Sequence, residues 1–205
     1  MGLWREATPT KPAAGRLLAV DATRGVTVAA AAVDGAPEAL GLSPARDRPG
    51  VRLYAAVATP EPDPAGPRDE LIGLPPPRRW RLLGLDPATL DVEREFPLPV
   101  PALELAVAPD GRDAYAVATE YHPTGRLLVR IGLRTGAVAP LGYAPVTGPG
   151  GFAVTADRLY VADTLRDRLW TADRAGVPHG SLATGPRPGG IAAAPRPPPV
   201  DRGRI

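Results

Sequence analysis

Hydrophobic positions recur along the chain in short runs of strand length, each bounded by Gly, Pro or Asp. One kind of run begins Arg-Leu-Leu or Arg-Leu-Trp and ends in a polar turn; it occupies 15–25, 80–91, 125–136 and 167–176. Short runs rich in Val, Leu and Tyr between turn residues predict β-strands. Only VTVAAAAV (26–33) is also compatible with a helix, so the pattern predicts an all-β protein.

Three further kinds of run alternate with the first in a fixed order. A run with an aromatic residue occupies 2–8, 52–59, 113–120 and 158–164; a run of small residues occupies 39–45, 102–111, 150–157 and 189–195; a last kind occupies 26–35, 92–99, 137–145 and 178–185. The leading arginines Arg16, Arg81, Arg126 and Arg168 are 65, 45 and 42 residues apart, and an insertion over 60–79 accounts for the long first interval. A period of this length indicates a repeat architecture.

The repeats carry a recognisable motif. SPARDRPGVRLYAAV (43–57), APDGRDAYAVA (108–118) and TADRLYVAD (155–163) resemble the SPDG-x-x-LYV signature of the YVTN and WD40-like β-propellers. This resemblance implies blades of four antiparallel strands, with the small-residue strand innermost, the aromatic strand second, the Arg-Leu strand third and the last kind outermost. It leaves the function open, because such propellers include binding modules, lactonases and dehydrogenases.

Counting the runs gives three complete blades, at 39–99, 102–145 and 150–185. The N-terminal fragment 2–35 lacks only an innermost strand, and 189–195 is an innermost strand without a blade. Pairing the two would close a four-bladed ring by a velcro contact between the ends of a propeller domain spanning 1–195. The alternative is a fragment of a larger propeller of six to eight blades. Residues 196–205 are expected to form a Pro-rich disordered tail.

Composition narrows the functional classes. Pro (28) and Gly (23) make up about a quarter of the 205 residues, so only a strict repeat is compatible with a folded chain. The absence of Cys excludes disulfides and thiolate chemistry. In a chain with a single Lys and no Cys, almost no group titrates between pH 7 and 9, so a small excess of Arg raises the pI to about 9.3 although the net charge is only +2. This pI therefore does not indicate nucleic-acid binding. No uninterrupted apolar run predicts a membrane span or a signal peptide, so we expect a cytoplasmic location.

The connections between strands indicate where a binding site would lie. Those between first and second and between third and fourth strands are expected to be tight turns, whereas those between second and third strands are longer and irregular. Loops on a rigid scaffold commonly carry binding residues. The polar residues predicted to form a binding site on this irregular face are Glu61, Asp63, Glu120, His122, Asp163, Arg166 and Arg187.

No reactive constellation stands out. His122 and His179 are predicted to lie in different parts of their blades, and no Asn is present, so no metal site and no cofactor are predicted. The recurring Asp21, Asp86 and Asp173 are predicted to form turns by bonding local backbone. We therefore expect a non-catalytic module that binds an unknown protein, peptide or small-molecule ligand, monomeric if the ring closes and dimeric if it is a half-ring.

Two alternatives remain open at this point. One is a propeller enzyme of the lactonase or sugar/quinone-dehydrogenase type, with a calcium ion at the channel mouth held by Glu104, Glu120 and Asp163. The other is a truncated propeller fragment without independent activity.

Overall fold

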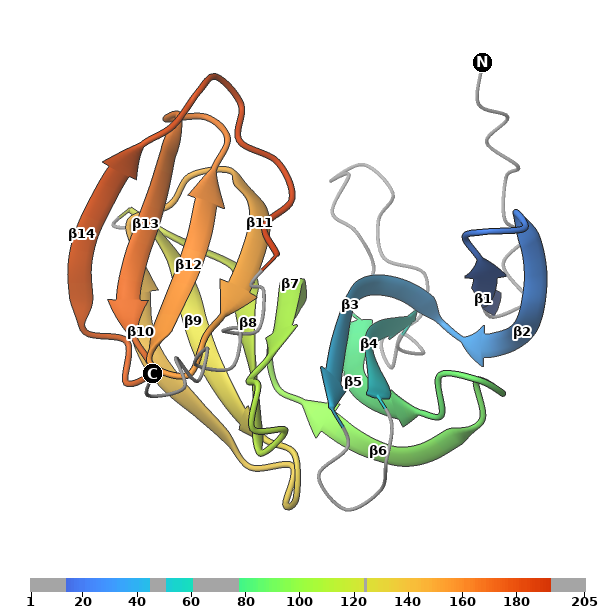
Figure 1. The fold of residues 1–205 in the computed structure, drawn as a ribbon. Helices are drawn as coiled ribbons and strands as arrows, with labels where there is room; N and C mark the ends of the chain where they lie inside the picture. The colour runs from blue at the N-terminus through green and yellow to red at the C-terminus, as the bar shows by residue number, and fades with distance from the viewer. Residues whose placement is uncertain (1–13, 45–50, 61–77, 124, 193–205) are drawn as a thin grey trace, which may run out of the picture.

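The computed structural model describes residues 14–44, 51–60, 78–123 and 125–192 (Figure 1). Within these ranges the chain forms β-strands and no helix, so nothing in them is a helix long and apolar enough to span a membrane. The strands are β1 (Ala14–Asp21), β2 (Val26–Asp34), β3 (Ala36–Pro44), β4 (Val51–Pro60), β5 (Arg78–Leu85), β6 (Val92–Leu98), β7 (Ala102–Val107), β8 (Asp113–His122), β9 (Gly125–Gly132), β10 (Val138–Ala144), β11 (Pro149–Val154), β12 (Arg158–Asp163), β13 (Arg168–Asp173) and β14 (Pro178–Ala183).

Twelve of these strands form three antiparallel four-stranded sheets, which we call blades 1, 2 and 3. Their orders are β3-β4-β5-β6, β7-β8-β9-β10 and β11-β12-β13-β14, while β1 and β2 form a two-stranded sheet. The all-β fold predicted from the sequence is confirmed, and the three four-stranded sheets fall on the runs 39–99, 102–145 and 150–185. The ambiguous run 26–33 is strand β2. The predicted insertion over 60–79 lies mostly outside the described residues, between the end of β4 at Pro60 and the start of β5 at Arg78.

The first strands of the blades lie side by side at the centre, where β7 contacts both β3 and β11 (Figure 1). Small residues are needed there because the backbones approach one another closely. A Cβ atom on Gly41 of β3 would lie 3.1 Å from Cγ2 of Val107 in β7. This close approach explains why the innermost runs are rich in Ala and Gly.

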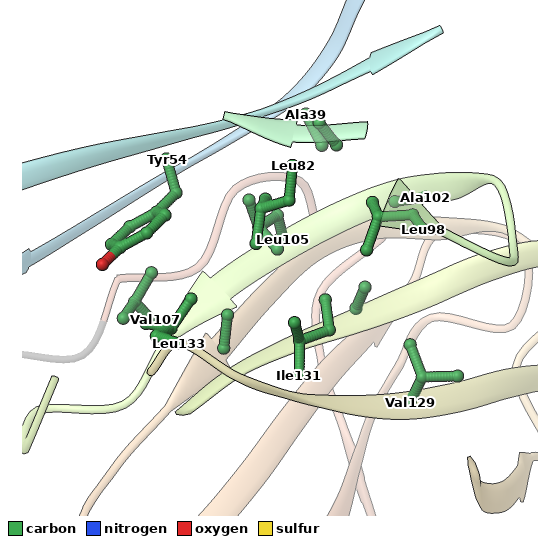
Figure 2. Close-up of a cluster of buried hydrophobic side chains, with 13 residues drawn as sticks. Ala39, Tyr54, Leu82, Leu98, Ala102, Leu105, Val107, Val129, Ile131 and Leu133 are labelled. Atoms are coloured by element: carbon green, nitrogen blue, oxygen red, sulfur yellow. The ribbon is translucent and has the colours of Figure 1, made fainter. Parts of the chain in front are cut away.

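Blades 1 and 2 each bury side chains from both of their faces. In β4, Ala55 and Val57 pack toward the β1–β2 sheet, whereas Tyr54 and Ala56 pack toward blade 2. Figure 2 shows the second of these cores, in which Tyr54 lies above Val107. A strand buried on both faces has a continuous apolar sequence rather than an alternating one, as the RLYAAVAT run does.

The aspartates predicted to form turns do so. Oδ1 of Asp21 accepts hydrogen bonds from the backbone N–H of Thr23 and Arg24 at 2.8 and 3.1 Å. Asp86 and Asp173 hold the corresponding turns of blades 1 and 3 in the same way. Such Asx turns fix the hairpin ends by local bonds.

One of these turns contains a left-handed residue that is not glycine. Gly25, Gly136 and Gly176 end the other third-to-fourth-strand turns with positive φ angles, but the equivalent position of blade 1 is Leu90, with φ at 64°. Leucine in this region costs about 1–2 kcal/mol. Its side chain is 3% exposed and packs with Leu17 and Val33, so burial of the side chain offsets the backbone cost.

The predicted velcro closure is not formed in the described residues. The runs 2–8 and 193–195 lie outside them, and 189–192 contain no strand. Instead the N–H of Gly190 donates to the carbonyl of Gly150, beside β11. Figure 1 shows β1–β2 and β11–β14 at opposite ends of the array. Gly190 has a left-handed φ of 48°, and the closure itself stays a prediction, because the runs that would form it lie mostly outside the described residues.

Candidate functional site

The connections of the array lie on two sides, which we call the loop side and the turn side. The loop side holds the second-to-third-strand hairpins and the links between blades, and the turn side holds the remaining hairpins. The predicted difference in length is wrong for the described residues. The β8–β9 link is only 123–124, whereas the β5–β6 turn spans 86–91. The reason is that β8 continues to His122 through a bulge after Val117.

The best-defined polar residue on the loop side is Asp163, at the end of β12. Its side chain is 2% exposed, and its carboxylate accepts three backbone N–H groups, from Thr147, Gly148 and Leu165, at 3.0, 3.1 and 3.2 Å. A buried carboxylate that accepts several N–H groups is well solvated by the protein. Asp163 therefore fixes the link between blades 2 and 3 instead of facing solvent.

This fixed link supports Leu165 and Arg166, whose side chains point outward. Leu165 is 71% exposed, and Arg166 is exposed while its Nη1 donates to the carbonyl of Pro145 at 3.2 Å. The guanidinium keeps further donors toward solvent, because an arginine side chain has five. A cationic and an apolar group thus stand next to each other on rigid backbone.

An aromatic pair lies on the same side of blade 2. The rings of His122, at the end of β8, and Tyr143, in β10, are 4.6 Å apart between centroids and tilted by 31°. Both residues are exposed. Tyr143 is two residues before Pro145, whose carbonyl accepts the hydrogen bond from Arg166.

Two neighbouring residues on the loop side have left-handed backbone. Asp167 has φ at 51° and Arg187 at 53°, and the N–H of Arg187 donates to Oδ1 of Asp167 at 2.7 Å. Asp tolerates this region, but Arg adopts it uncommonly. Strained positions of this kind cluster at functional sites.

The structure places part of the predicted site on the loop side of the array. His122, Arg166 and Arg187 are exposed on the loop side, and Asp163 is buried beneath it. Glu61 and Asp63 lie outside the described residues, as does the side chain of Glu120. The sequence prediction missed Tyr143 and Leu165. Their place at the ends of repeat runs is the signal that would have found them. We call His122, Tyr143, Leu165, Arg166 and Arg187 the loop-side patch.

The calcium arrangement receives no support from the described part of the chain. No group of three His, Cys, Asp or Glu side chains in it is placed to hold a metal ion. The oxygens of Asp163 are taken by backbone N–H groups. Glu104 lies elsewhere, on β7, where burial raises the pKa of its carboxyl group.

Glu104 lines a cavity between the β1–β2 sheet and the central strands. The cavity has a volume of about 640 Å³, and its lining includes Leu18, Leu40, Leu53, Leu90, Glu38 and Glu104. Glu38 forms an ion pair with Arg78 at 3.3 Å. The cavity is thus mostly apolar, with few polar groups at its edge.

The turn side carries a different kind of polar cluster, which joins blades 2 and 3. Arg174 donates to the hydroxyl of Tyr115 at 2.9 Å and contacts Asp110 and Asp113 at 3.3 and 3.2 Å. Burial lowers the pKa of Arg174, but the hydrogen bond to Tyr115 and the charges of Tyr115 and Asp110 outweigh it and raise the pKa overall. The guanidinium is used in holding the two blades together.

Comparisons with known proteins bear on the fold. No family model matches the chain, and no curated protein matches it. The chain is similar to the solved structure of hydrazine synthase from Kuenenia stuttgartiensis, with a TM-score of 0.53 and 17% identity, over 83% of this chain and 56% of that one. It also matches a chain of the nidogen/laminin complex, with a TM-score of 0.31 and 11% identity, over 85% and 92%.

Taken with the geometry, the first similarity supports the fold alone, because the identity is low. The chain has an all-β fold of the β-propeller class, built from four-stranded blades arranged around their first strands. It spans just over half the length of the hydrazine synthase chain that it matches.

Proposed function

We propose that this chain is a non-catalytic propeller module of the YVTN/WD40-like kind that binds a protein or peptide segment on its loop side. The observation that carries the proposal is the loop-side patch on rigid backbone. The repeat motifs around Tyr54, Tyr115 and Tyr160 support the family assignment.

The composition of the patch fits protein recognition. Tyr and Arg are enriched among the residues that contribute most to interface affinity. Tyr143, Arg166 and Arg187 are all exposed. Leu165 at 71% exposure adds an apolar contact next to them. Because Asp163 fixes the backbone beneath, little ordering entropy is lost when a ligand binds.

The strain at Arg187 separates a structural from a functional role. Replacing a left-handed Arg by Gly removes a backbone cost of about 1 kcal/mol. We expect Arg187→Gly to raise the free energy of unfolding by about this amount and to weaken ligand binding. A variant that is stabilised and binds unchanged would show that Arg187 takes no part in recognition.

The experiment is a selection of random peptides displayed on phage against the full chain. Selected peptides are then measured by calorimetry against the wild-type chain and two variants, Arg166→Ala and Leu165→Ser. The matched controls on the turn side are Arg134→Ala and Val177→Ser, at residues that are likewise exposed. We expect the patch variants to weaken binding at least about tenfold, which is 1.4 kcal/mol, and the controls to bind unchanged.

Two results would overturn the proposal. One is a selection that yields no peptide with saturable binding. The other is a set of peptides whose affinity depends on the turn-side residues and not on the patch.

A further inference from the structure

The first strands of the three blades share a β-bulge at the same place in the repeat. The register of pairing with the second strand shifts just before Ala39 in β3, just before Glu104 in β7 and just before Gly151 in β11. These three residues therefore occupy equivalent positions. A bulge re-aims the side chains next to it, and bulges are common beside functional sites.

Blade 2 differs from its neighbours at this position, because it has a carboxylate where they have Ala39 and Gly151, which are both buried. Packing of a blade thus requires only a small residue here. Glu104 is half-buried, and its carboxylate has no hydrogen bond or ion pair to another residue within the described ranges. Burying a charged group without a partner costs free energy. A residue that breaks the local pattern at such a cost indicates a function.

The side chain of Glu104 lines the cavity of about 640 Å³ between the β1–β2 sheet and the central strands. Leu103, the extra residue of the bulge, lines the same cavity, whereas successive side chains of a regular strand point to opposite faces. On the other walls, Leu18 and Leu40 are 55% and 54% exposed. The cavity therefore combines apolar walls with one carboxylate, and its volume is within the range of about 300–1,000 Å³ typical of small-molecule pockets.

The remaining charged residues of the lining identify Glu104 as the place for a cation. Glu38 forms an ion pair with Arg78 at 3.3 Å. Arg16 is exposed, so water solvates its guanidinium. Burial raises the pKa of Glu104, which shows that no neighbouring cation compensates the loss of water around its carboxylate. A ligand cation would favour the ionised carboxylate and form a charge-assisted hydrogen bond with it.

We propose that this cavity binds a small organic amine, whose ammonium group donates to the carboxylate of Glu104 and whose apolar body lies against Leu18, Leu40 and Leu103. The apolar walls favour an aliphatic or aromatic body, and the unpaired carboxylate favours a single cationic group. This inference does not depend on the proposed function of the loop side, since the cavity shares no residue with the loop-side patch.

The test titrates the full chain with cyclohexylmethylamine and with cyclohexylmethanol, which has the same apolar body and no charge. NMR of the leucine methyl groups follows both titrations. We expect each probe to shift the signals of Leu18, Leu40 and Leu103 in a saturable manner. The amine should bind at least about tenfold more tightly, because a hydrogen bond to a charged group contributes at least this factor.

Two variants separate the carboxylate from the apolar walls. Glu104→Gln keeps the size of the side chain and removes its charge, so it should bind the amine at least about tenfold more weakly and the alcohol unchanged. Glu95→Gln is the matched control, because it removes the same charge from β6, outside the lining. Leu40→Ser should weaken the binding of both probes, whereas Leu182→Ser, similarly exposed (62%) on β14, should weaken neither.

Cooperative thermal unfolding of each variant shows that a loss of affinity is not a loss of fold. The proposal would be overturned if the amine gave no saturable shifts, if the amine and the alcohol bound equally, or if Glu104→Gln bound the amine as tightly as the wild-type chain. A mass that doubles with concentration and returns to that of a monomer in Leu40→Ser would overturn it too, because a second copy would then cover the cavity.

Discussion

The junction between blades 2 and 3 and the junction between the β1–β2 sheet and blade 1 use the same repeat positions with different results. Thirteen buried residues form the first core and seven the second, within the described residues. The first junction also has Arg174 on the turn side and Asp163 on the loop side. The second has a left-handed leucine and an open cavity.

The two junctions differ because the apolar face of a blade is fully covered only where a four-stranded sheet packs against it, whereas the β1–β2 sheet has two strands within the described residues. The outer strands of the preceding sheet cover Val57 and Leu83, which are at most 3% exposed. Leu40 and Leu42 of β3, which β1 and β2 do not cover, are 54% and 63% exposed. An array of this kind gains stability from each interface between neighbouring repeats, so its weakest part is expected at the β1–β2 sheet.

The largest expected effect compares one leucine in each junction. Leu159 is 0% exposed in the core of blades 2 and 3, and Leu17 is 6% exposed next to the cavity. We expect Leu159→Ala to lower the free energy of unfolding by about 4 kcal/mol and Leu17→Ala by about 2 kcal/mol, because the second change enlarges a space that already exists. Urea unfolding measures both. Equal losses would contradict the comparison.

The next effect concerns the loop-side links. Asp163→Ala leaves three N–H groups without their acceptor and is expected to cost about 3 kcal/mol. Asp163→Asn keeps one acceptor oxygen and should cost about half as much. At the junction between the β1–β2 sheet and blade 1, the hydroxyl of Thr59 donates to the carbonyl of Asp34 at 3.1 Å. Thr59→Val should therefore lower the free energy of unfolding by about 1 kcal/mol. Thermal unfolding of the three variants checks the order. An Asp163→Ala variant that unfolds at the wild-type temperature would contradict the conclusion that Asp163 fixes the link between blades 2 and 3.

A smaller effect is expected on the turn side. Arg174 contacts partners across the junction of blades 2 and 3, with its side chain 24% exposed, whereas Arg24 pairs with Asp21 in its own turn and is 79% exposed. We expect Arg174→Met to cost about 1–2 kcal/mol and Arg24→Met close to nothing, since exposed ion pairs contribute little. A double-mutant cycle with Asp113→Ala isolates the contribution of the cross-blade pair. Coupling energies near zero would argue against it.

The smallest expected effect depends on pH and on Glu104, which lines the cavity. Burial raises the pKa of this carboxyl above its ordinary value near 4.5. The folded chain therefore favours the protonated form, and this stabilising contribution is lost as pH rises through the folded pKa. We expect Glu104→Gln to raise the melting temperature slightly at pH 7, and the gain to disappear below the ordinary pKa. A gain that is the same at both pH values would show that desolvation of Glu104 is not its cause.

The sequence predicted most of the fold because every strand of a blade carries its own residue pattern. The runs with Tyr54, Tyr115 and Tyr160 became the second strands, and Asp21, Asp86 and Asp173 formed turns as expected. The velcro closure stays a prediction, because the runs 2–8 and 193–195 lie outside the described residues, and pairing between chain ends depends on long-range geometry that a local residue pattern does not encode. The binding site itself stays a prediction, and only part of the placement of its residues was predictable. Polar character identified Arg166, but it did not show that the carboxylate of Asp163 is turned inward, since composition does not indicate hydrogen-bond partners.

Hydrogen exchange of the full chain tests whether the array is weakest at the β1–β2 sheet. Seven buried residues form the core next to β1 and β2, and thirteen form the core between blades 2 and 3. Amides open locally at lower free energy where fewer apolar side chains are buried, so we expect the hydrogen-bonded amides of β1 and β2 to exchange faster than those of β12 and β13. Equal or slower exchange of the β1 and β2 amides would contradict the account.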